Sequence, residues 1–240
     1  MYDMKKTLIF IIIISFNFLF ANNIEISDFI KKYSQLKGLD KIQDINDFKI
    51  SGTVINNNRK FEFNFYYLKP NFYRLNLKGT GVSFHIAYDG VKGMIKDPIN
   101  PPVPIDNYTK ITLSSLSKLI FSPLYEHEKQ GLKINFSNLE KIDDQICYKF
   151  NLIDNNGIYT DIFVDTTELN LIKYEKIEQL GEESMPNYEK YSNYKSIDGI
   201  RIPFKLEQKI LDINYLYQID SVRFNIGLTT FDFRMPGSQY

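Results

Sequence analysis

Apolar and polar residues alternate along most of this chain, which is the pattern of half-buried β-strands. The alternation is clearest between residues 82 and 89, where the apolar positions are Val82, Phe84, Ile86 and Tyr88. The next two residues, Asp89 and Gly90, both tolerate positive φ, so we expect a tight hairpin turn and a return strand from Gly93. Strand, short turn and strand recur down the chain, and this pattern predicts an antiparallel sheet.

The same period of two predicts strands on both sides of that hairpin. They cover residues 48–54, 61–68, 73–77, 132–136, 145–153, 158–165, 169–180, 188–196, 200–209 and 213–224. The turns between them are predicted at 56–58, 143–144, 155–157, 181–187 and 198–199, which are rich in Asn, Asp and Gly. About 11 strands are too many for a flat open sheet. We therefore predict a mainly β (α+β) fold, with a strongly curved antiparallel sheet or a partly closed barrel and helices over one side.

One predicted strand carries a row of aromatic side chains on a single face. Its members are Phe61, Phe63, Phe65 and Tyr67. The row is either ordinary core or part of the wall of an apolar cavity, because so curved a sheet can enclose more apolar volume than two short helices fill. Phe84 and Ile86 would line the same cavity, and the composition alone leaves both interpretations open.

Two segments have the period of amphipathic helices. The first covers residues 26–36, with Ser27 as the expected N-cap and Gly38 as the stop, and residues 39–45 add a further turn. The second carries an apolar stripe of Leu113, Leu116, Leu119 and Ile120. We expect this stripe to face the concave side of the sheet, with a short helix restarting at Ser122 and Pro123.

Residues 98–109 contain four prolines and predict an exposed or lid-like loop without regular structure.

The start of the chain has the pattern of a secretory signal peptide. Lys5 and Lys6 precede a short apolar run that ends at Ala21. The run is shorter than the ~20 apolar residues of a membrane-spanning helix. We therefore predict a signal peptide at 1–21 and one domain at 22–240, with an uncleaved N-terminal anchor as the alternative.

Cleavage after Ala21 gives the first testable prediction. Sequencing the N-terminus of protein recovered from the periplasm should give Asn22 as the first residue. Recovery of the full-length chain in the inner membrane would contradict the signal-peptide interpretation.

Composition narrows the classes of partner. Lys plus Arg and Asp plus Glu number 29 each, so the chain has no basic excess typical of nucleic-acid binding or of polybasic membrane adhesion. The 19 Phe and 17 Tyr suit sheet surfaces and apolar interiors. A single cysteine, Cys147, excludes an intramolecular disulfide and is expected to be a small core residue.

Catalytic and metal-binding motifs are absent from the sequence. His85 and Asp89 could form a base–carboxylate pair, but alternation places both opposite Phe84 and Ile86, on the face that we expect to be solvated. His127 stands far away in sequence. We therefore predict no catalytic residues, no metal site and no cofactor, and we interpret Asp89-Gly90 and Asp198-Gly199 as turns.

Arg74 alternates out of its predicted strand. It either faces water or points into the concavity, where it would bind a carboxylate, a headgroup or a lid carbonyl.

Several of these segments also resemble bacterial LolA-like proteins, the superfamily of periplasmic outer-membrane lipoprotein carriers. The similar segments are KKYSQLKGLDKIQDINDFKISGTV at 31–54, KPNFYR at 69–74, AYDGVKGMIKDP at 87–98, YEKYSNYKSIDGIRIPF at 188–204 and FDFRMP at 231–236. Together they extend over about residues 26–237 in the family's order. Carriers of this family have an arginine directly before the proline of the second segment, where this chain has Lys69.

The resemblance implies a half-open antiparallel barrel whose apolar concave face is covered by helices that act as a lid. It further implies a periplasmic, non-enzymatic carrier of lipids or lipoprotein acyl chains, with an inner-membrane donor and an outer-membrane acceptor as partners. On that basis the cavity wall would comprise Phe61, Phe63, Phe65, Tyr67, Phe84, Ile86, Leu116, Leu119 and Ile120, with Arg74 as a polar anchor. The alternative is a structural or interaction domain of the cell envelope whose core is filled by its own side chains. The sequence does not specify an oligomeric state.

Overall fold

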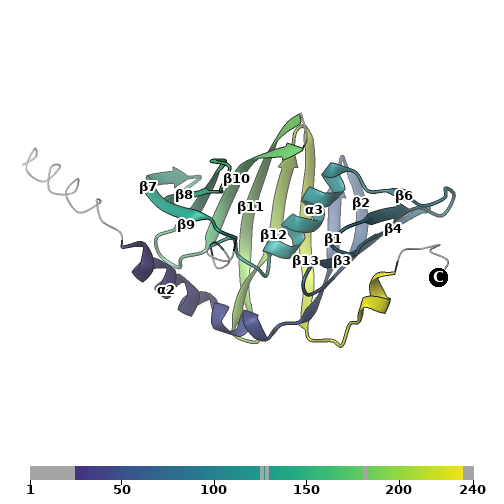
Figure 1. Cartoon of the computed structure of the whole chain (residues 1–240), viewed down its shortest axis with the longest axis horizontal. Coiled ribbons are helices and arrows are strands. Elements are labelled where there is room, and N and C mark those ends of the chain that lie inside the picture. Colours follow the sequence, from purple (N-terminus) through teal and green to yellow (C-terminus); the bar gives the residue numbers. More distant parts are fainter. Residues whose placement is uncertain (1–24, 125–126, 128–129, 181–182, 235–240) are drawn as a thin grey trace, which may run out of the picture.

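A computed structural model describes residues 25–124, 127, 130–180 and 183–234, so the predicted signal peptide lies outside the described residues. Within these ranges thirteen strands form one antiparallel sheet that is curved but not closed (Figure 1). The predicted mainly β, half-open architecture with two helices is confirmed, although it has two more strands than the expected 11.

The sheet consists of two meanders that meet in its middle. The first contains β1 (Asp47–Asn56), β2 (Arg59–Leu68), β3 (Phe72–Gly79), β4 (Val82–Tyr88), β5 (Gly93–Lys96) and β6 (Val103–Pro104). The second contains β7 (Lys133–Ile142), β8 (Gln145–Ile153), β9 (Tyr159–Asp165), β10 (Leu171–Leu180), β11 (Glu183–Ile197), β12 (Ile200–Ile210) and β13 (Ile213–Phe224). β1 pairs with β13, so β6 and β7 are the two edges.

In the described ranges, two α-helices accompany the sheet. Helix α2 (Ile26–Lys37) ends at Gly38, which adopts a left-handed φ of 66°, and continues into a 3₁₀ turn η1 (Leu39–Asp44) as expected. Its N-cap is Glu25 rather than Ser27, because the helix begins at Ile26, two residues earlier than a cap at Ser27 implies, and the Ser27 hydroxyl donates to the Glu25 carboxylate instead (3.1 Å).

Helix α3 (Asn107–Lys118) belongs to the segment that crosses from edge β6 to edge β7, and it lies across the middle of the sheet (Figure 1). Its N-cap Asp106 accepts a hydrogen bond from the Thr109 backbone N–H (2.8 Å). The prediction that residues 98–109 lack regular structure is therefore wrong in the middle and at the C-terminal end of this stretch. Val103 and Pro104 form an edge strand, where proline is tolerated, and α3 begins at Asn107.

Two predicted turns differ from the structure. The Asp89-Gly90 turn is a four-residue loop, because the Asp89 carboxylate accepts the backbone N–H groups of Val91 (2.9 Å) and Lys92 (2.7 Å). The turn predicted at 181–187 is too long: β11 already begins at Glu183, and only residues 181–182 lie outside the described residues. Pro186 fits this strand because its ring nitrogen faces the end of β12, where the Leu211 N–H donates to the Pro186 carbonyl (3.2 Å).

Other turns agree with the sequence. Asp198 and Gly199 both have positive φ, 51° and 79°, and form the predicted two-residue turn between β11 and β12.

Candidate functional site

The predicted aromatic row lies on the face of the sheet that α2 and α3 cover. Phe63, Phe65 and Tyr67 are buried there, and Phe61 is half-buried. The Phe65 ring packs between Phe48 and Tyr73, with ring centroids 6.1 and 6.0 Å away.

Strand β4 contributes to the same face. Ile86 is buried in the core, and the ring of Phe84 packs on Phe61 at 6.3 Å between centroids. The structure thus brings together all of the strand residues that we predicted for a cavity wall. Their contact with a ligand stays a prediction.

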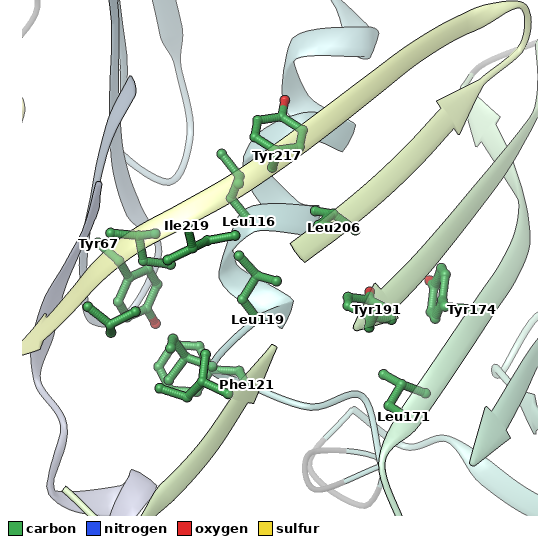
Figure 2. Close-up of a cluster of buried hydrophobic side chains, with 14 of the residues drawn as sticks. Tyr67, Leu116, Leu119, Phe121, Leu171, Tyr174, Tyr191, Leu206, Tyr217 and Ile219 are labelled. Carbon is green, nitrogen blue, oxygen red and sulfur yellow. The ribbon is translucent and has the colours of Figure 1, made fainter. Parts of the chain in front are cut away.

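The mid-chain apolar stripe faces this row. Leu116, Leu119 and Ile120 are buried in the same core, and Figure 2 shows Leu116 and Leu119 between the side chains of β13 and those of β10 and β11. The helix is shorter than the stripe, because α3 ends at Lys118 and the N–H groups of Ile120 and Phe121 bond to the Ser117 carbonyl in a final turn.

Residues 122–124 are not helical, and the rest of the short helix predicted to restart there falls on a segment of which residues 125–126 and 128–129 lie outside the described residues.

Helix α2 closes the other end of the concave face. The Phe29 ring packs on Phe150 of β8 at 4.4 Å between centroids, and the Tyr33 and Ser122 hydroxyls hydrogen-bond at 2.8 Å. Phe121 in turn packs on Tyr67 at 5.0 Å between centroids. In the described part of the chain, the space between sheet and helices is therefore filled by the protein's own side chains.

A hollow of about 600 Å³ opens above α3, between the two flanks of the half-barrel. Tyr67 and Tyr73 line one flank, and Leu152, Thr160 and Tyr174 line the other. Ser114, Ser117 and Lys118 of α3 form its floor. We call this hollow the mouth.

A larger hollow of about 800 Å³ lies elsewhere. It is lined largely by Lys and Glu side chains of β10, β11 and β12 that alternate with the core residues, so it belongs mainly to the outer face.

A buried polar cluster lies beneath α3, and sequence reasoning missed it. Its centre is Glu189 of β11, which has no solvent exposure although its strand neighbours Tyr188 and Lys190 face outwards. The Glu189 carboxylate accepts hydrogen bonds from Ser115 (2.5 Å) and Lys118 (3.0 Å) of α3. It also accepts hydrogen bonds from Asn187 (2.9 Å) and from the Tyr191 hydroxyl.

Two further side chains complete this cluster. The Gln208 side-chain amide of β12 donates to the Ser115 hydroxyl (2.7 Å) and to Asn187 (3.2 Å). The Lys118 ammonium lies 3.9 Å from the ring centroid of Tyr174 of β10, a close cation–π contact. We call Ser115, Lys118, Tyr174, Asn187, Glu189, Tyr191 and Gln208 the Glu189 cluster.

Both charges of the cluster are held in their ionised forms. Burial alone would raise the pKa of Glu189, but the Lys118 ammonium and the hydrogen bonds from Ser115 and Tyr191 hold it below its ordinary value. Burial alone would lower the pKa of Lys118, but the Glu189 carboxylate holds it above its ordinary value. The cluster therefore attaches the end of α3 to the sheet through a desolvated ion pair.

Arg74 points away from the concave face. It alternates with the buried Leu75 on β3, stacks its guanidinium 4.8 Å from the Tyr66 ring centroid, and donates to the Asp232 carbonyl (2.9 Å). Asp232 belongs to a C-terminal 3₁₀ turn, η2 (Thr230–Phe233), that covers the outer face of β3. Of the two alternatives for Arg74, the structure has the outward one, and the carbonyl that it binds belongs to the C-terminal segment.

The remaining candidates lie apart from the mouth. His85 is exposed beside Asn76 (3.1 Å), while the Asp89 carboxylate binds its own loop. The buried His127 ring contacts the Leu124 carbonyl (2.6 Å). Cys147 is buried, and burial raises the pKa of its thiol to about 11.

Within the described ranges, no group of three or more His, Cys, Asp or Glu side chains could hold a metal ion. No helix in that part of the chain is long and apolar enough to cross a membrane.

Several solved structures are similar to this chain over most of its length. A DUF1329 family protein from Desulfovibrio piger matches with a TM-score of 0.55 and 13% identity, covering 84% of this chain and 95% of that one. A LolA superfamily protein from Nitrosomonas europaea matches with a TM-score of 0.51 and 12% identity, covering 84% and 96%. The chain has a LolA-like fold.

A third similar structure, a putative outer membrane lipoprotein-sorting protein domain from Vibrio parahaemolyticus, has a TM-score of 0.50 and 14% identity, covering 82% of this chain and 95% of that one. No protein-family model and no curated protein matches the sequence. At these identities the comparison establishes the fold alone.

Proposed function

We propose that this protein is a non-enzymatic periplasmic carrier that holds lipid or lipoprotein acyl chains on the concave face, in the place that α3 occupies here. The observation that carries the proposal is the arrangement of that face. A largely apolar surface from β8 to β4, interrupted by the Glu189 cluster on β11 and β12, is covered by α3 and by the residues that follow it, and these belong to the segment that crosses between the sheet edges. The sorting domain and the LolA superfamily protein with this fold support the same class of function.

Helix α3 is suited to be a movable lid. Three of its last five residues are serines, at 114, 115 and 117, and serine is a weaker helix former than alanine or leucine. The Ser117 hydroxyl donates to the Ser114 carbonyl (2.7 Å), which competes with regular helical bonding. Contacts with the sheet therefore provide most of the stability of α3, and an acyl chain that replaces these contacts would release it.

The free energy gained by burying an acyl chain is sufficient to displace α3 from the concave face. Each buried methylene contributes about 0.8 kcal/mol, so a chain of a dozen carbons offsets the loss of several apolar contacts of α3. An inner-membrane donor and an outer-membrane acceptor would then supply and remove the cargo.

Native mass spectrometry of protein isolated from the periplasm tests this function. We expect a mass excess that corresponds to a lipid or an acylated peptide, lost on delipidation and restored by incubation with membrane extract. A variant Leu116→Ser, which weakens the packing of α3, should take up a fluorescent fatty acid more readily than the parent protein. A folded parent that binds no amphiphile in either experiment would contradict the carrier function.

The packed interior favours a second candidate, a structural or interaction domain of the cell envelope. Phe65 and Leu116 have no solvent exposure, so the described core holds no preformed space for cargo beneath α3. The same two experiments separate the candidates, because this domain would carry no lipid whether or not α3 is weakened.

A further inference from the structure

The Glu189 cluster is a binding site for an ammonium group that the chain's own Lys118 occupies. The ammonium donates to the Glu189 carboxylate (3.0 Å) and lies over the face of Tyr174 (3.9 Å). A carboxylate and an aromatic face are the groups that bind ammonium ions most strongly in proteins. The Lys118 side chain keeps 14% of its surface exposed, while Glu189 has none, so the ammonium lies where the mouth meets the core.

The two halves of this site belong to different parts of the fold. Lys118 and Ser115 are on α3, whereas Tyr174, Glu189 and Gln208 are on β10, β11 and β12 of the sheet. If α3 is displaced by cargo, the cation leaves and the carboxylate stays on the concave face. Gln208 also has a buried Oε1 with no hydrogen-bond partner in the described part of the chain, so the sheet half holds an acceptor that Lys118 does not use.

An all-hydrocarbon cargo would cover this carboxylate without compensating its charge. Leaving one charge of a buried pair without its partner is strongly unfavourable, whereas restoring a cation with hydrogen bonds offsets the desolvation. The apolar surface around Glu189 therefore favours cargo that brings its own cation to the position of the Lys118 ammonium.

We propose that the cargo is an amphiphile with a primary ammonium group, which replaces the Lys118 ammonium on Glu189 and Tyr174 while its acyl chain lies along the aromatic row. This inference rests on the proposed carrier function and names the chemical class of its ligand.

The test compares three probes of equal chain length: dodecylamine, dodecanol and lauric acid, each below its micelle concentration. Each probe displaces a fluorescent fatty acid from the protein at pH 7. We expect dodecylamine to bind at least about tenfold more tightly than dodecanol, given the strength of hydrogen bonds to charged groups. In the variant Glu189→Gln that preference should disappear, while dodecanol binding is retained.

Lys118→Ala is the decisive variant because it removes the internal competitor. It should raise the affinity for dodecylamine by a clearly larger factor than the affinity for dodecanol, whereas a merely looser attachment of α3 would raise both affinities by the same factor. Dodecylamine should also raise its melting temperature, because a ligand that binds only the folded state stabilises it.

Two further variants provide a substitute in case Lys118→Ala does not fold and a control for effects outside the concave face. If Lys118→Ala does not fold, Tyr174→Leu leaves the ion pair intact and should weaken dodecylamine binding alone. Glu207→Gln, on the outer face of β12, is the matched control and should leave all affinities unchanged.

The outcomes separate the two proposals. If no probe binds to the folded parent, the carrier function itself fails. If all three probes bind with similar affinity, or if Glu189→Gln keeps the preference for the amine, the ammonium inference fails and the carrier function stands.

Discussion

Replacing Glu189 by alanine is expected to lower the free energy of unfolding by about 3–5 kcal/mol at pH 7, as for other buried ion pairs that lose one partner. The variant leaves the Lys118 ammonium nearly buried beside Tyr174 and removes the acceptor for Ser115, Asn187 and Tyr191. Urea-induced unfolding followed by circular dichroism measures the change.

A matched control is available on the next strand. Glu207 of β12 pairs with Lys205 at 2.6 Å, but both side chains are exposed, so Glu207→Ala should change stability by less than about 1 kcal/mol. The double variant Glu189→Leu with Lys118→Met removes both charges and should recover much of the loss, because an apolar pair of similar volume packs without desolvation of ions. Equal, small effects at Glu189 and Glu207 would contradict the structure of the cluster.

The effect of Glu189→Ala should depend on pH in a defined direction. The pKa of Glu189 in the folded protein lies below its ordinary value of 4.5, so the unfolded chain takes up this proton first as the pH falls. The stability that Glu189 contributes is therefore complete above about 4.5 and declines below it. The difference in free energy of unfolding between the parent and Glu189→Ala should therefore become smaller as the pH falls below this value. A difference that becomes larger in acid would contradict the prediction.

Phe65→Ala is expected to lower the free energy of unfolding by about 3–5 kcal/mol, the usual range for truncating a fully buried phenylalanine. Phe65 has no exposed surface and contacts Phe48 and Tyr73, so truncation leaves a cavity that the rigid sheet cannot fill. The same unfolding experiment measures the loss.

Phe231 supplies the comparison for Phe65. Its side chain is 66% exposed on the C-terminal turn, and its replacement by alanine should change the free energy of unfolding by no more than about 0.5 kcal/mol. A small effect at Phe65 would mean that this part of the wall is not packed in solution and already stands open to cargo. A large effect combined with lipid uptake would instead mean that binding requires α3 to move.

Much of the sheet could be predicted because its strands have one buried and one exposed face. In β2 four of the five aromatic residues, Phe61, Phe63, Phe65 and Tyr67, occupy every second position, and this row identifies the strand and its inner face. The Asp198-Gly199 turn could be predicted for a similar local reason, since both residues accept the left-handed conformation that the turn requires.

The Glu189 cluster could not be found in this way. Strand β11 is polar on both faces, so alternation does not reveal which face is buried, and its partner Lys118 lies 71 residues away in the sequence. A charged residue in a strand ordinarily faces water, and only the position of α3 shows that this one does not.

The outward position of Arg74 had been one of two alternatives. Deciding between them needed the C-terminal turn that receives its hydrogen bond, and no periodicity marks that turn.

The pairing of β1 with β13 has a consequence for how the chain folds. Each meander is built from neighbouring hairpins, whose ends meet after closing short loops, whereas Phe48 and Phe224 pair across 176 residues (224 − 48). Closing so long a loop carries a large entropic cost, and long-range pairings slow folding. We therefore expect the two meanders to form early and to join at the centre of the sheet last, so that a chain truncated before residue 213 should keep collapsed hairpins but never assemble the native sheet.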